Sequence, residues 1–414
     1  MKYKEGFSTS LIDHLLDVTS PRSVLDPFSG IGTTPLVSAG RGLKATGIEI
    51  LPVASLTAKA IAVAANGLKT MQFKKSANEL VKHLGRDVKS RTEYAFPHFR
   101  ITEAAFPART ESQLAKAREF LSYIDDPDIH TMLNVACMSV LESASFTRKD
   151  GQYLRWDSRS GKSSSKRNQH IPITRFDEAL SSRLHEMTED IKPLQKQLGG
   201  GMPDFIEGSS LNHLRQLSED SFDMVITSPP YANRYDYTRT YALELAWIGF
   251  DDDKLKNLRQ RLLSATVENK PKLQWLQACY RDSPVLKSAV AMFGEQRVLQ
   301  EVLSELKKSQ KQLSNSNIVR MLEGYFLEMA VVIAELGRIV RPGGTVIMVN
   351  DNVQYHGHEL PVDLILSDFA ENSGFLCANI WALTRRKGNS SQQMGRFGRR
   401  ELRKGVYRWV KETS

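Results

Sequence analysis

The stretch of sequence that decides the fold is SVLDPFSGIGTT, residues 23–34. It places a short apolar strand directly before a glycine-rich turn, and the turn opens a helix that runs to about Gly40. A second strand at 45–49 and an Ala-rich helix at 52–65 complete a β-α-β unit. This alternation predicts a parallel sheet whose crossovers are right-handed.

Five further strands are predicted after this unit, at 204–206, 222–227, 345–350, 375–384 and 405–411. The last two have no helix between them, so we expect an antiparallel hairpin there, whereas the first five strands of the chain alternate with helices. The sequence therefore predicts an α/β fold with a seven-stranded Rossmann-like sheet and two mainly helical insertions.

The two insertions divide the predicted core into three parts. The expected boundaries are 1–67 for the first part of the core, 68–202 for a helical and basic insertion, 203–250 for the next part of the core, 251–324 for a second helical insertion, and 325–414 for the last strands and a basic hairpin. The first insertion falls between the second and third strands. A helix at 325–340 is expected to end at the turn 341–344, before the next strand begins.

Composition and charge narrow the class of protein. The chain has 414 residues and a formal net charge of +9, which suits a polyanionic partner without proving one. No apolar run approaches the roughly 20 residues that a membrane span needs, and we expect a cytoplasmic protein with no membrane partner. The three cysteines, Cys137, Cys279 and Cys377, form no CxxC pair, and the histidines are scattered, so no metal site is predicted.

The glycine-rich turn predicts a ligand site. Gly30 and Gly32 allow a ligand to approach the backbone at a helix N-terminus, and Asp26 ends the strand before them. Glu49 lies 17 residues after Gly32, at the end of the second strand, where a carboxylate can accept hydrogen bonds from both hydroxyls of a ribose. The turn lacks the GxGxxG spacing of dinucleotide-binding enzymes, which argues against NAD.

A second motif, TSPPY at 227–231, follows directly on the predicted strand 222–227. Two consecutive prolines end the hydrogen-bond ladder of the strand and hold the backbone extended and rigid. Ser228 before them and Tyr231 after them are then directed toward the sheet edge where α/β proteins bind their ligands. A chance SPPY in a turn would mean little, but its place after the fourth strand of this sheet argues against chance.

Together the two motifs carry a family resemblance. DPFSGIGTT is similar to the S-adenosylmethionine turn, often DPFxGxGTT, of DNA methyltransferases that modify exocyclic amino groups, and TSPPY resembles their (D/N/S)PP(Y/F/W) motif. The resemblance covers the whole predicted sheet and implies a class I methyltransferase fold. Gly6-Phe7 and a helix at 8–18 resemble the flanking cofactor motif of the family. The residues that the resemblance assigns to S-adenosylmethionine are Phe7, Asp26, Pro27, Phe28, Gly30, Gly32, Thr33, Glu49, Ile50 and Ser209.

One position departs from the family pattern. The third strand of these enzymes commonly ends in Gly-Asp-Ser, whose Asp contacts the adenine of the cofactor, whereas this chain reads EGSS at 207–210. Ser209 takes that position without the charge. The contact with the adenine is therefore either missing or made by the Ser209 hydroxyl.

The resemblance implies direct methyl transfer to the amino group of a flipped base, with the cofactor motif preceding the catalytic motif. It assigns catalysis to Ser228, Pro229, Pro230 and Tyr231: the Ser228 Oγ and the Pro229 carbonyl accept the amino protons, and Tyr231 stacks on the base. The chain has no Pro-Cys dipeptide, the usual nucleophile of enzymes that methylate ring carbon 5 of cytosine.

The target base stays open at this point. Ser in the first position is more typical of N4-cytosine enzymes than of N6-adenine enzymes, and the rule has exceptions, so cytosine N4 is favoured and adenine N6 remains the alternative. Two readings from other classes also remain: an RNA base-amino methyltransferase, and a non-catalytic nucleic-acid-binding protein built on the same sheet.

Two basic segments are candidates for contacts with double-stranded DNA, and a solvated basic loop is the alternative for each. Residues 148–175 hold eight Lys or Arg against two Asp, and residues 385–411 hold ten against one Glu. The strand before the second segment runs parallel to the catalytic strand, so its loop should emerge at the ligand-bearing edge. A cognate restriction endonuclease is a further expected partner. DNA contacts are expected from Arg148, Lys149, Gln152, Arg155, Asn389, Ser390, Gln392, Gln393, Arg396 and Arg399.

Overall fold

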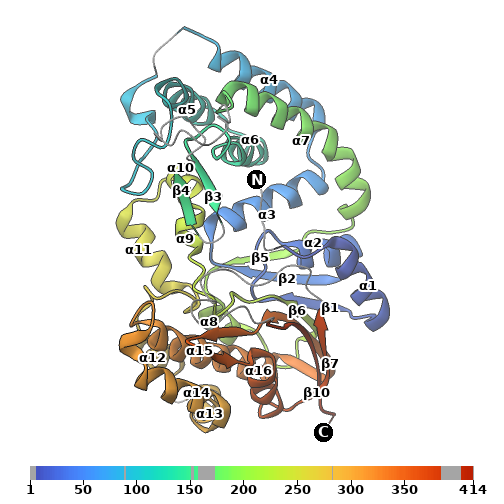
Figure 1. Cartoon of the computed structure of the whole chain (residues 1–414). Helices are drawn as coiled ribbons and strands as arrows, with labels where there is room; N and C mark the ends of the chain where they lie inside the picture. The colour runs from blue at the N-terminus through green and yellow to red at the C-terminus, as the bar shows by residue number, and fades with distance from the viewer. Residues whose placement is uncertain are drawn as a thin grey trace.

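The computed structural model describes residues 6–87, 90–150, 153–156, 173–281, 283–383 and 402–413 (Figure 1). Its centre is a seven-stranded sheet in the order β10-β11-β7-β6-β1-β2-β5, in which β11 alone runs antiparallel to its neighbours. The prediction of seven strands that end in an antiparallel hairpin is confirmed. The strands are β1 (Ser23–Asp26), β2 (Lys44–Glu49), β5 (Asp204–Glu207), β6 (Phe222–Thr227), β7 (Val340–Asp351), β10 (Phe375–Leu383) and β11 (Lys404–Lys411).

Helices cover both faces of this sheet (Figure 1). One face is covered by α1 (Thr9–Thr19), α2 (Thr33–Gly40) and α3 (Pro52–Ala65), which bury apolar residues against β1 and β6. The other face is covered by α15 (Ile318–Ile339) and α16 (Val362–Glu371), together with the short α8 (Ser210–His213) and η2 (Leu214–Gln216). The central strands β1 and β6 are buried almost throughout because helices cover both faces there, whereas the edge strands β5 and β10 are partly exposed.

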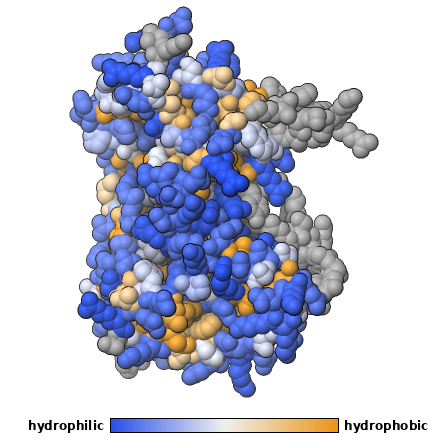
Figure 2. Space-filling model, turned by 90° about the vertical axis from the view of Figure 1, so that its left-hand side faces the viewer, coloured by the Kyte–Doolittle hydropathy of each residue, from blue (hydrophilic) through white to orange (hydrophobic). Residues whose placement is uncertain are grey.

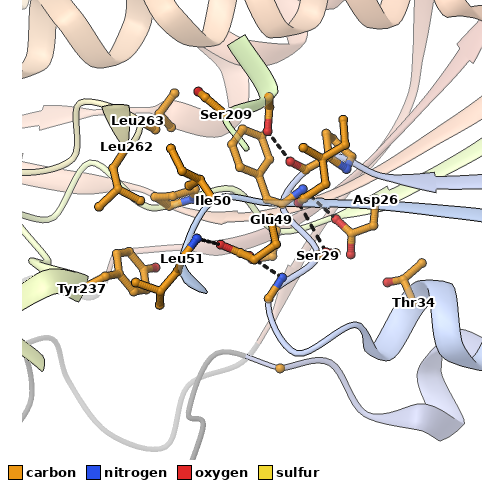
Figure 3. A pocket seen from close by; sticks show the side chains of 18 of the residues that line it. Asp26, Ser29, Thr34, Glu49, Ile50, Leu51, Ser209, Tyr237, Leu262 and Leu263 are labelled. Atoms are coloured by element: carbon orange, nitrogen blue, oxygen red, sulfur yellow. Dashed lines mark hydrogen bonds between the residues drawn. The ribbon is translucent and has the colours of Figure 1, made fainter. Parts of the chain in front are cut away.

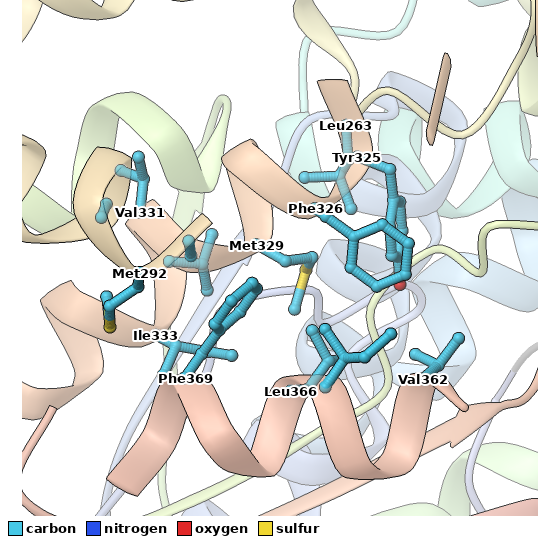
Figure 4. Close-up of a cluster of buried hydrophobic side chains, with 14 of the residues drawn as sticks. Leu263, Met292, Tyr325, Phe326, Met329, Val331, Ile333, Val362, Leu366 and Phe369 are labelled. Atoms are coloured by element: carbon cyan, nitrogen blue, oxygen red, sulfur yellow. The ribbon is translucent and has the colours of Figure 1, made fainter. Parts of the chain in front are cut away.

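The larger core lies between the sheet and the helices of the second face. Phe326 and Met329 of α15 pack toward Leu366 and Phe369 of α16, and all four side chains are fully buried (Figure 4). Leu263, from the loop after α11, reaches the same cluster and also lines the pocket described below. The core therefore supports one wall of the candidate site.

The first insertion lies between β2 and β5 and forms the upper part of Figure 1. It has its own buried core, which includes Phe73, Leu133 and Leu180. It also contains a two-stranded hairpin where the sequence predicted a basic loop. Its elements are α4 (Thr70–Leu84), η1 (Thr92–Tyr94), α5 (Ala108–Leu121), α6 (Pro127–Ser139), β3 (Thr147–Asp150), β4 (Tyr153–Trp156) and α7 (Phe176–Leu198).

The second insertion, predicted at 251–324, is helical as expected, and two short helices precede it after β6. The helices α9 (Tyr237–Thr240) and α10 (Ala242–Trp247) pack mainly against the first insertion, through a core that includes Tyr241 and Trp247. Among the later elements, α11 lies at the left of Figure 1 at mid-height, and the helices after it lie below. They are α11 (Asp252–Arg261), α12 (Leu273–Tyr280), α13 (Pro284–Glu295), α14 (Arg297–Lys308) and η3 (Gln310–Gln312).

Two element boundaries differ from the prediction. Helix α15 begins at Ile318 rather than at residue 325, and strand β7 begins at Val340, so the sequence RPGG at 341–344 lies within the strand. Val340 pairs with Phe222, and a register shift between Phe222 and Met224 accommodates the irregular start. A small hairpin of β8 (Val353–Tyr355) and β9 (His358–Leu360) was not predicted. Within the described ranges, no helix is both long enough and apolar enough to cross a membrane.

Candidate active site

The glycine-rich turn connects β1 to α2 at the carboxyl end of the sheet. Gly30 has a φ of 55° and Gly32 a φ of 82°, both in the left-handed region that side chains disfavour. A Cβ on Gly32 would also lie 2.9 Å from Cζ of Phe205. The two glycines therefore allow a tight turn whose backbone stays close to the space above the strands.

Asp26 joins this turn to the catalytic strand. Its Oδ1 accepts hydrogen bonds from the backbone N–H of Phe28 at 3.0 Å and from Thr227 Oγ1 at 2.7 Å. Burial outweighs these hydrogen bonds and raises the pKa of the Asp26 carboxyl to about 6. Because Thr227 is the residue before Ser228, Asp26 holds the two motifs of the sequence in a fixed relation.

Glu49 lies at the end of β2 beside the same turn (Figure 3). Its Oε2 accepts a hydrogen bond from Gly30 N, and its Oε1 accepts one from Leu51 N, each at 2.7 Å. Burial raises the pKa of the Glu49 carboxyl to about 7, although both backbone hydrogen bonds oppose that shift. Each carboxylate oxygen still has lone pairs for a ligand, so the side chain is held in place and remains an acceptor.

These groups line one pocket, with about 800 Å³ of empty volume that opens to solvent. The pocket contains nine of the ten residues that the sequence assigned to the cofactor: Phe7, Asp26, Pro27, Phe28, Gly30, Thr33, Glu49, Ile50 and Ser209. The tenth, Gly32, is not part of the lining and shapes the turn instead. Among the lining residues that sequence reasoning missed are Tyr237, Leu262 and Leu263, which come from the chain after β6 (Figure 3).

A second pocket lies on the other side of Ser228. Ser228, Phe7 and Tyr237 line both pockets, so the two spaces adjoin. Pro229 and Tyr231 line the second pocket, and Pro230 lines the first. The structure thus brings all four residues of the SPPY motif, 228–231, to the boundary between the pockets. Residues that sequence reasoning missed in the second pocket include Asn233, Tyr235, Asp351 and Lys404.

The Ser228 hydroxyl has two neighbours. It donates to the Val349 carbonyl at 3.1 Å, and the Tyr231 hydroxyl lies 3.2 Å from the same Oγ. Since the single Ser228 proton is committed to Val349, Tyr231 is the donor in the second contact. The Ser228 Oγ therefore keeps a lone pair that can accept a further proton-bearing group.

The strand beside the catalytic motif is fixed by buried polar contacts. Asn350 Nδ2 donates to the Tyr325 hydroxyl, and Asn350 Oδ1 accepts from Asp351 N, each at 2.8 Å. Asn350 and Tyr325 are both fully buried. In the antiparallel register of β7 and β11, Asp351 is opposite Lys404. The Lys404 Nζ lies 6.0 Å from the centre of the Tyr231 ring. The second pocket thus has a rigid wall that carries one acidic and one basic side chain.

Comparison with known proteins identifies the family. No family profile matches the chain. Over 99% of its length the chain is 38% identical to the type II methyltransferase M.BsoBI of Geobacillus stearothermophilus, and it covers 85% of that protein. It is 39% identical to the type II methyltransferase M.AvaI of Nostoc sp. (strain PCC 7120 / SAG 25.82 / UTEX 2576) and of Anabaena variabilis, again over 99% of the chain and 85% of the relative. The chain belongs to the type II DNA methyltransferases.

The start of the first basic segment of the methyltransferase forms the β3–β4 hairpin. Arg148 and Arg155 are directly opposite each other across its strands, and Arg155 is exposed. The glycine at position 151, a residue type favoured in two-residue hairpin turns, could have indicated this hairpin from the sequence.

Lys149 differs from the expectation for this segment. It is buried, its Nζ forms an ion pair with the buried Glu244 of α10, and it lies 4.4 Å from the centre of the Tyr241 ring. A phosphate could reach this ammonium only by breaking the ion pair and exposing Glu244. Lys149 therefore anchors the hairpin to the segment that follows the catalytic motif, and it is not a candidate for a phosphate contact.

The remaining predicted DNA contacts of the methyltransferase lie outside the described residues. The strand β10 that precedes the second basic segment runs in the same direction as β6, as predicted, so residue 384 follows the carboxyl end of β10. The contacts outside the described ranges are Gln152, Asn389, Ser390, Gln392, Gln393, Arg396 and Arg399.

Proposed function

We propose that this methyltransferase transfers a methyl group from S-adenosylmethionine to the N4 amino group of a flipped cytosine within a specific DNA sequence. The observation that carries the proposal is the position of Ser228, which lines both the pocket beside Glu49 and the pocket beside Tyr231. A methyl donor in the first pocket and an extrahelical base in the second would meet at this side chain.

The hydrogen bonds of Ser228 suit it to accept a proton from an amino group. An exocyclic amine on a base is a poor nucleophile because its lone pair is delocalised into the ring. When acceptors bind its two N–H groups, the nitrogen becomes more tetrahedral and its lone pair becomes available for attack. Ser228 Oγ is a directed acceptor because its own proton is held by Val349. The Pro229 carbonyl, on the backbone that the two prolines hold rigid, is proposed as the second acceptor.

The residues that line the pocket beside Glu49 fit S-adenosylmethionine in their chemistry. They offer a carboxylate for the ribose hydroxyls, apolar walls from Ile50 and Leu262 for the adenine, and Phe7 near Ser228 for the methionine end. When bound, the cofactor supplies an electrophilic methyl group on a positively charged sulfur. The chain itself then needs only to position the amine, and no covalent intermediate with the protein is required.

The preference for cytosine over adenine rests on two features of the second pocket. The first motif position is Ser rather than Asp or Asn, which favours N4-cytosine chemistry. The pocket also carries the ammonium of Lys404, which donates hydrogen bonds, and the carboxylate of Asp351, which accepts them. Next to its amino group cytosine has two acceptors, N3 and O2, whereas adenine has N1 and then a C–H group. A basic side chain therefore gains more from cytosine, and adenine N6 is kept as the second candidate.

The decisive experiment identifies the product base. Duplex DNA is methylated with labelled cofactor, digested to nucleosides and analysed by mass spectrometry, with the Ser228→Ala variant as a control for contaminating enzymes. N4-methylcytosine is the expected product. N6-methyladenine would replace the cytosine assignment while keeping the site, and label that enters transfer RNA but not DNA would overturn the whole proposal.

Substrate anchoring is proposed for the basic segments that flank the site. Arg148 and Arg155 of the β3–β4 hairpin, and Arg396 and Arg399 of the second segment, are assigned to DNA phosphates. The amides Gln152, Asn389, Gln392 and Gln393, with Ser390, are assigned to base edges. Since the relatives are type II methyltransferases, we also propose a cognate restriction endonuclease that cleaves the same sequence when it is unmethylated.

A further inference from the structure

A third cavity adjoins the cofactor pocket on the side away from the catalytic motif. It holds about 1000 Å³ of empty volume, open in part to solvent, between α8, the end of α11 and α12. Ser209 lines both this cavity and the cofactor pocket, so the two spaces meet at the end of β5. None of the sequence motifs or proposed roles described above uses this cavity.

The described residues that line the cavity are basic or uncharged. Arg261, Lys270 and Lys272 line it, and none of the described residues in its lining is Asp or Glu. Lys272 already forms an ion pair with the buried Glu328, whose two carboxylate oxygens lie 2.8 and 2.9 Å from the Lys272 Nζ. No carboxylate among the described residues forms an ion pair with Arg261 or Lys270, and both side chains are exposed. Two cations are therefore available to an anionic ligand.

An aromatic wall stands beside these cations. Trp275 of α12 lines the cavity, and 41% of its surface is exposed. α11 and α12 lie on the left of Figure 1, the side that Figure 2 turns toward the viewer, and hydrophilic residues dominate the middle of that face. The accessible indole can stack on a planar ring, and the two cations beside it can bind a phosphate. A nucleotide is a ligand that carries both groups.

The walls of the cavity are fixed by internal hydrogen bonds. Gln260 donates through Nε2 to the Glu268 carbonyl at 3.0 Å and accepts from Lys270 N at 2.9 Å. The Lys272–Glu328 ion pair ties the same loop to α15, since Glu328 Oε2 also accepts from Ser264 N at 2.8 Å. Arg261, Lys270 and Trp275 therefore project from a rigid frame, which lowers the entropic cost of binding a ligand.

We propose that this cavity binds one nucleotide of the DNA substrate outside the base that is methylated, with its phosphate on Arg261 and Lys270 and its ring or sugar against Trp275. Three strand spacings separate β5, next to the cavity, from the catalytic strand β6. At roughly 4.8 Å each, these spacings put the cavity about 14 Å from the catalytic strand along the sheet edge. This distance corresponds to roughly four base-pair steps of 3.4 Å between the methylated base and the nucleotide in the cavity. The inference rests on DNA as the substrate and is independent of which base is methylated.

The test compares two double variants that remove the same charge. Arg261→Ala/Lys270→Ala removes both cations of the cavity, and Lys287→Ala/Arg297→Ala removes two exposed cations from α13 and α14 as a matched control. The probe is a fluorescent duplex, and its anisotropy gives Kd across a salt series. Losing two phosphate contacts should lower the slope of log K against log salt by about 1.8 and weaken binding roughly 60-fold at 0.1 M salt. The control should behave as wild type.

Trp275 gives an independent readout. Trp275→Ala should weaken duplex binding by about 5- to 150-fold, the range expected for one lost stacking contact, while the salt slope stays unchanged. Trp275→Phe keeps an aromatic ring and should restore much of the affinity. Calorimetric binding of the cofactor is measured for every variant, because an intact cofactor pocket shows that the fold has survived.

Two results would overturn the proposal. In the first, the cavity variant and the control variant bind the duplex with the same Kd and the same salt slope. In the second, a free mononucleotide binds wild type but not the cavity variant, while duplex binding is unchanged, which would make the cavity a site for a small nucleotide. The product base at saturating DNA is a separate measurement, so failure of this inference leaves the proposed function untouched.

Discussion

Glu49 should make cofactor binding depend on pH near neutrality. Burial raises the pKa of its carboxyl to about 7 in the ligand-free protein. Ribose hydroxyls donate hydrogen bonds and favour the ionised form, so the cofactor should lower this pKa and release a proton on binding. A group with a pKa of 7 is about 90% protonated at pH 6 and about 10% protonated at pH 8. The cofactor should therefore bind about tenfold more weakly at pH 6 than at pH 8, a difference of about 1.4 kcal/mol.

The assay is isothermal titration calorimetry at several pH values between 6 and 8. At pH 7 about half a proton should be released per cofactor bound, which is read from titrations in buffers of different ionisation enthalpy. Glu49→Gln keeps the shape of the side chain without its titration, so it reports the pH dependence of all other groups, including those of the cofactor. If wild type and Glu49→Gln show the same pH profile and the same proton release, the assigned role of Glu49 is wrong.

Four further predictions concern catalysis, DNA binding and stability. Ser228→Ala should lower the single-turnover rate by about 100-fold and leave cofactor affinity unchanged, because it removes an acceptor that acts on the reacting amine; rapid-quench kinetics and calorimetry measure both. Arg155→Ala should weaken binding to target and random duplexes alike and reduce the salt slope by about 0.9, whereas equal slopes would place the hairpin off the DNA. Lys149→Met should lower the free energy of unfolding, measured in urea, by about 3 kcal/mol, because Glu244 would be left buried without its partner. Lys149→Met/Glu244→Met should recover much of this loss. An unchanged free energy of unfolding in the single variant would contradict the buried ion pair. Burial raises the pKa of the Asp26 carboxyl to about 6 and that of the Glu49 carboxyl to about 7, so their contribution to the stability of the ligand-free protein is complete below about pH 4 and is lost as pH rises through 6 to 7. The Tm measured by thermal unfolding should therefore be higher at pH 5 than at pH 8 as far as these two groups contribute, and Glu49→Gln should reduce this difference in Tm.

The local sequence was sufficient for the central sheet. Strands and turns depend on short-range features, such as the glycines at 30 and 32 and the prolines at 229 and 230, which restrict the backbone wherever they occur. The carboxyl ends of parallel strands meet at one edge, so the topology alone brought the turn at 26–34 and the motif at 227–231 together. The predicted sheet and its closing hairpin could therefore be derived before any contact was known.

Other parts of the site were decided by contacts between residues far apart in the chain. Lys149 has the sequence signature of a solvated basic loop, and only its packing against Glu244 shows that its charge is already paired. Leu262 and Leu263 look like ordinary helix-end residues, yet they line the pocket beside Glu49 because Glu328 holds the neighbouring loop.

The second pocket shows the same limit. Asp351 and Lys404 are separated by 52 intervening residues, and the antiparallel register of β7 and β11 places them side by side near Tyr231. The sequence by itself determined the backbone that presents Ser228 and Glu49, because local stereochemistry fixes that backbone. The tertiary structure decided which side chains surround them, because burial and pairing depend on which distant segments fold against each other.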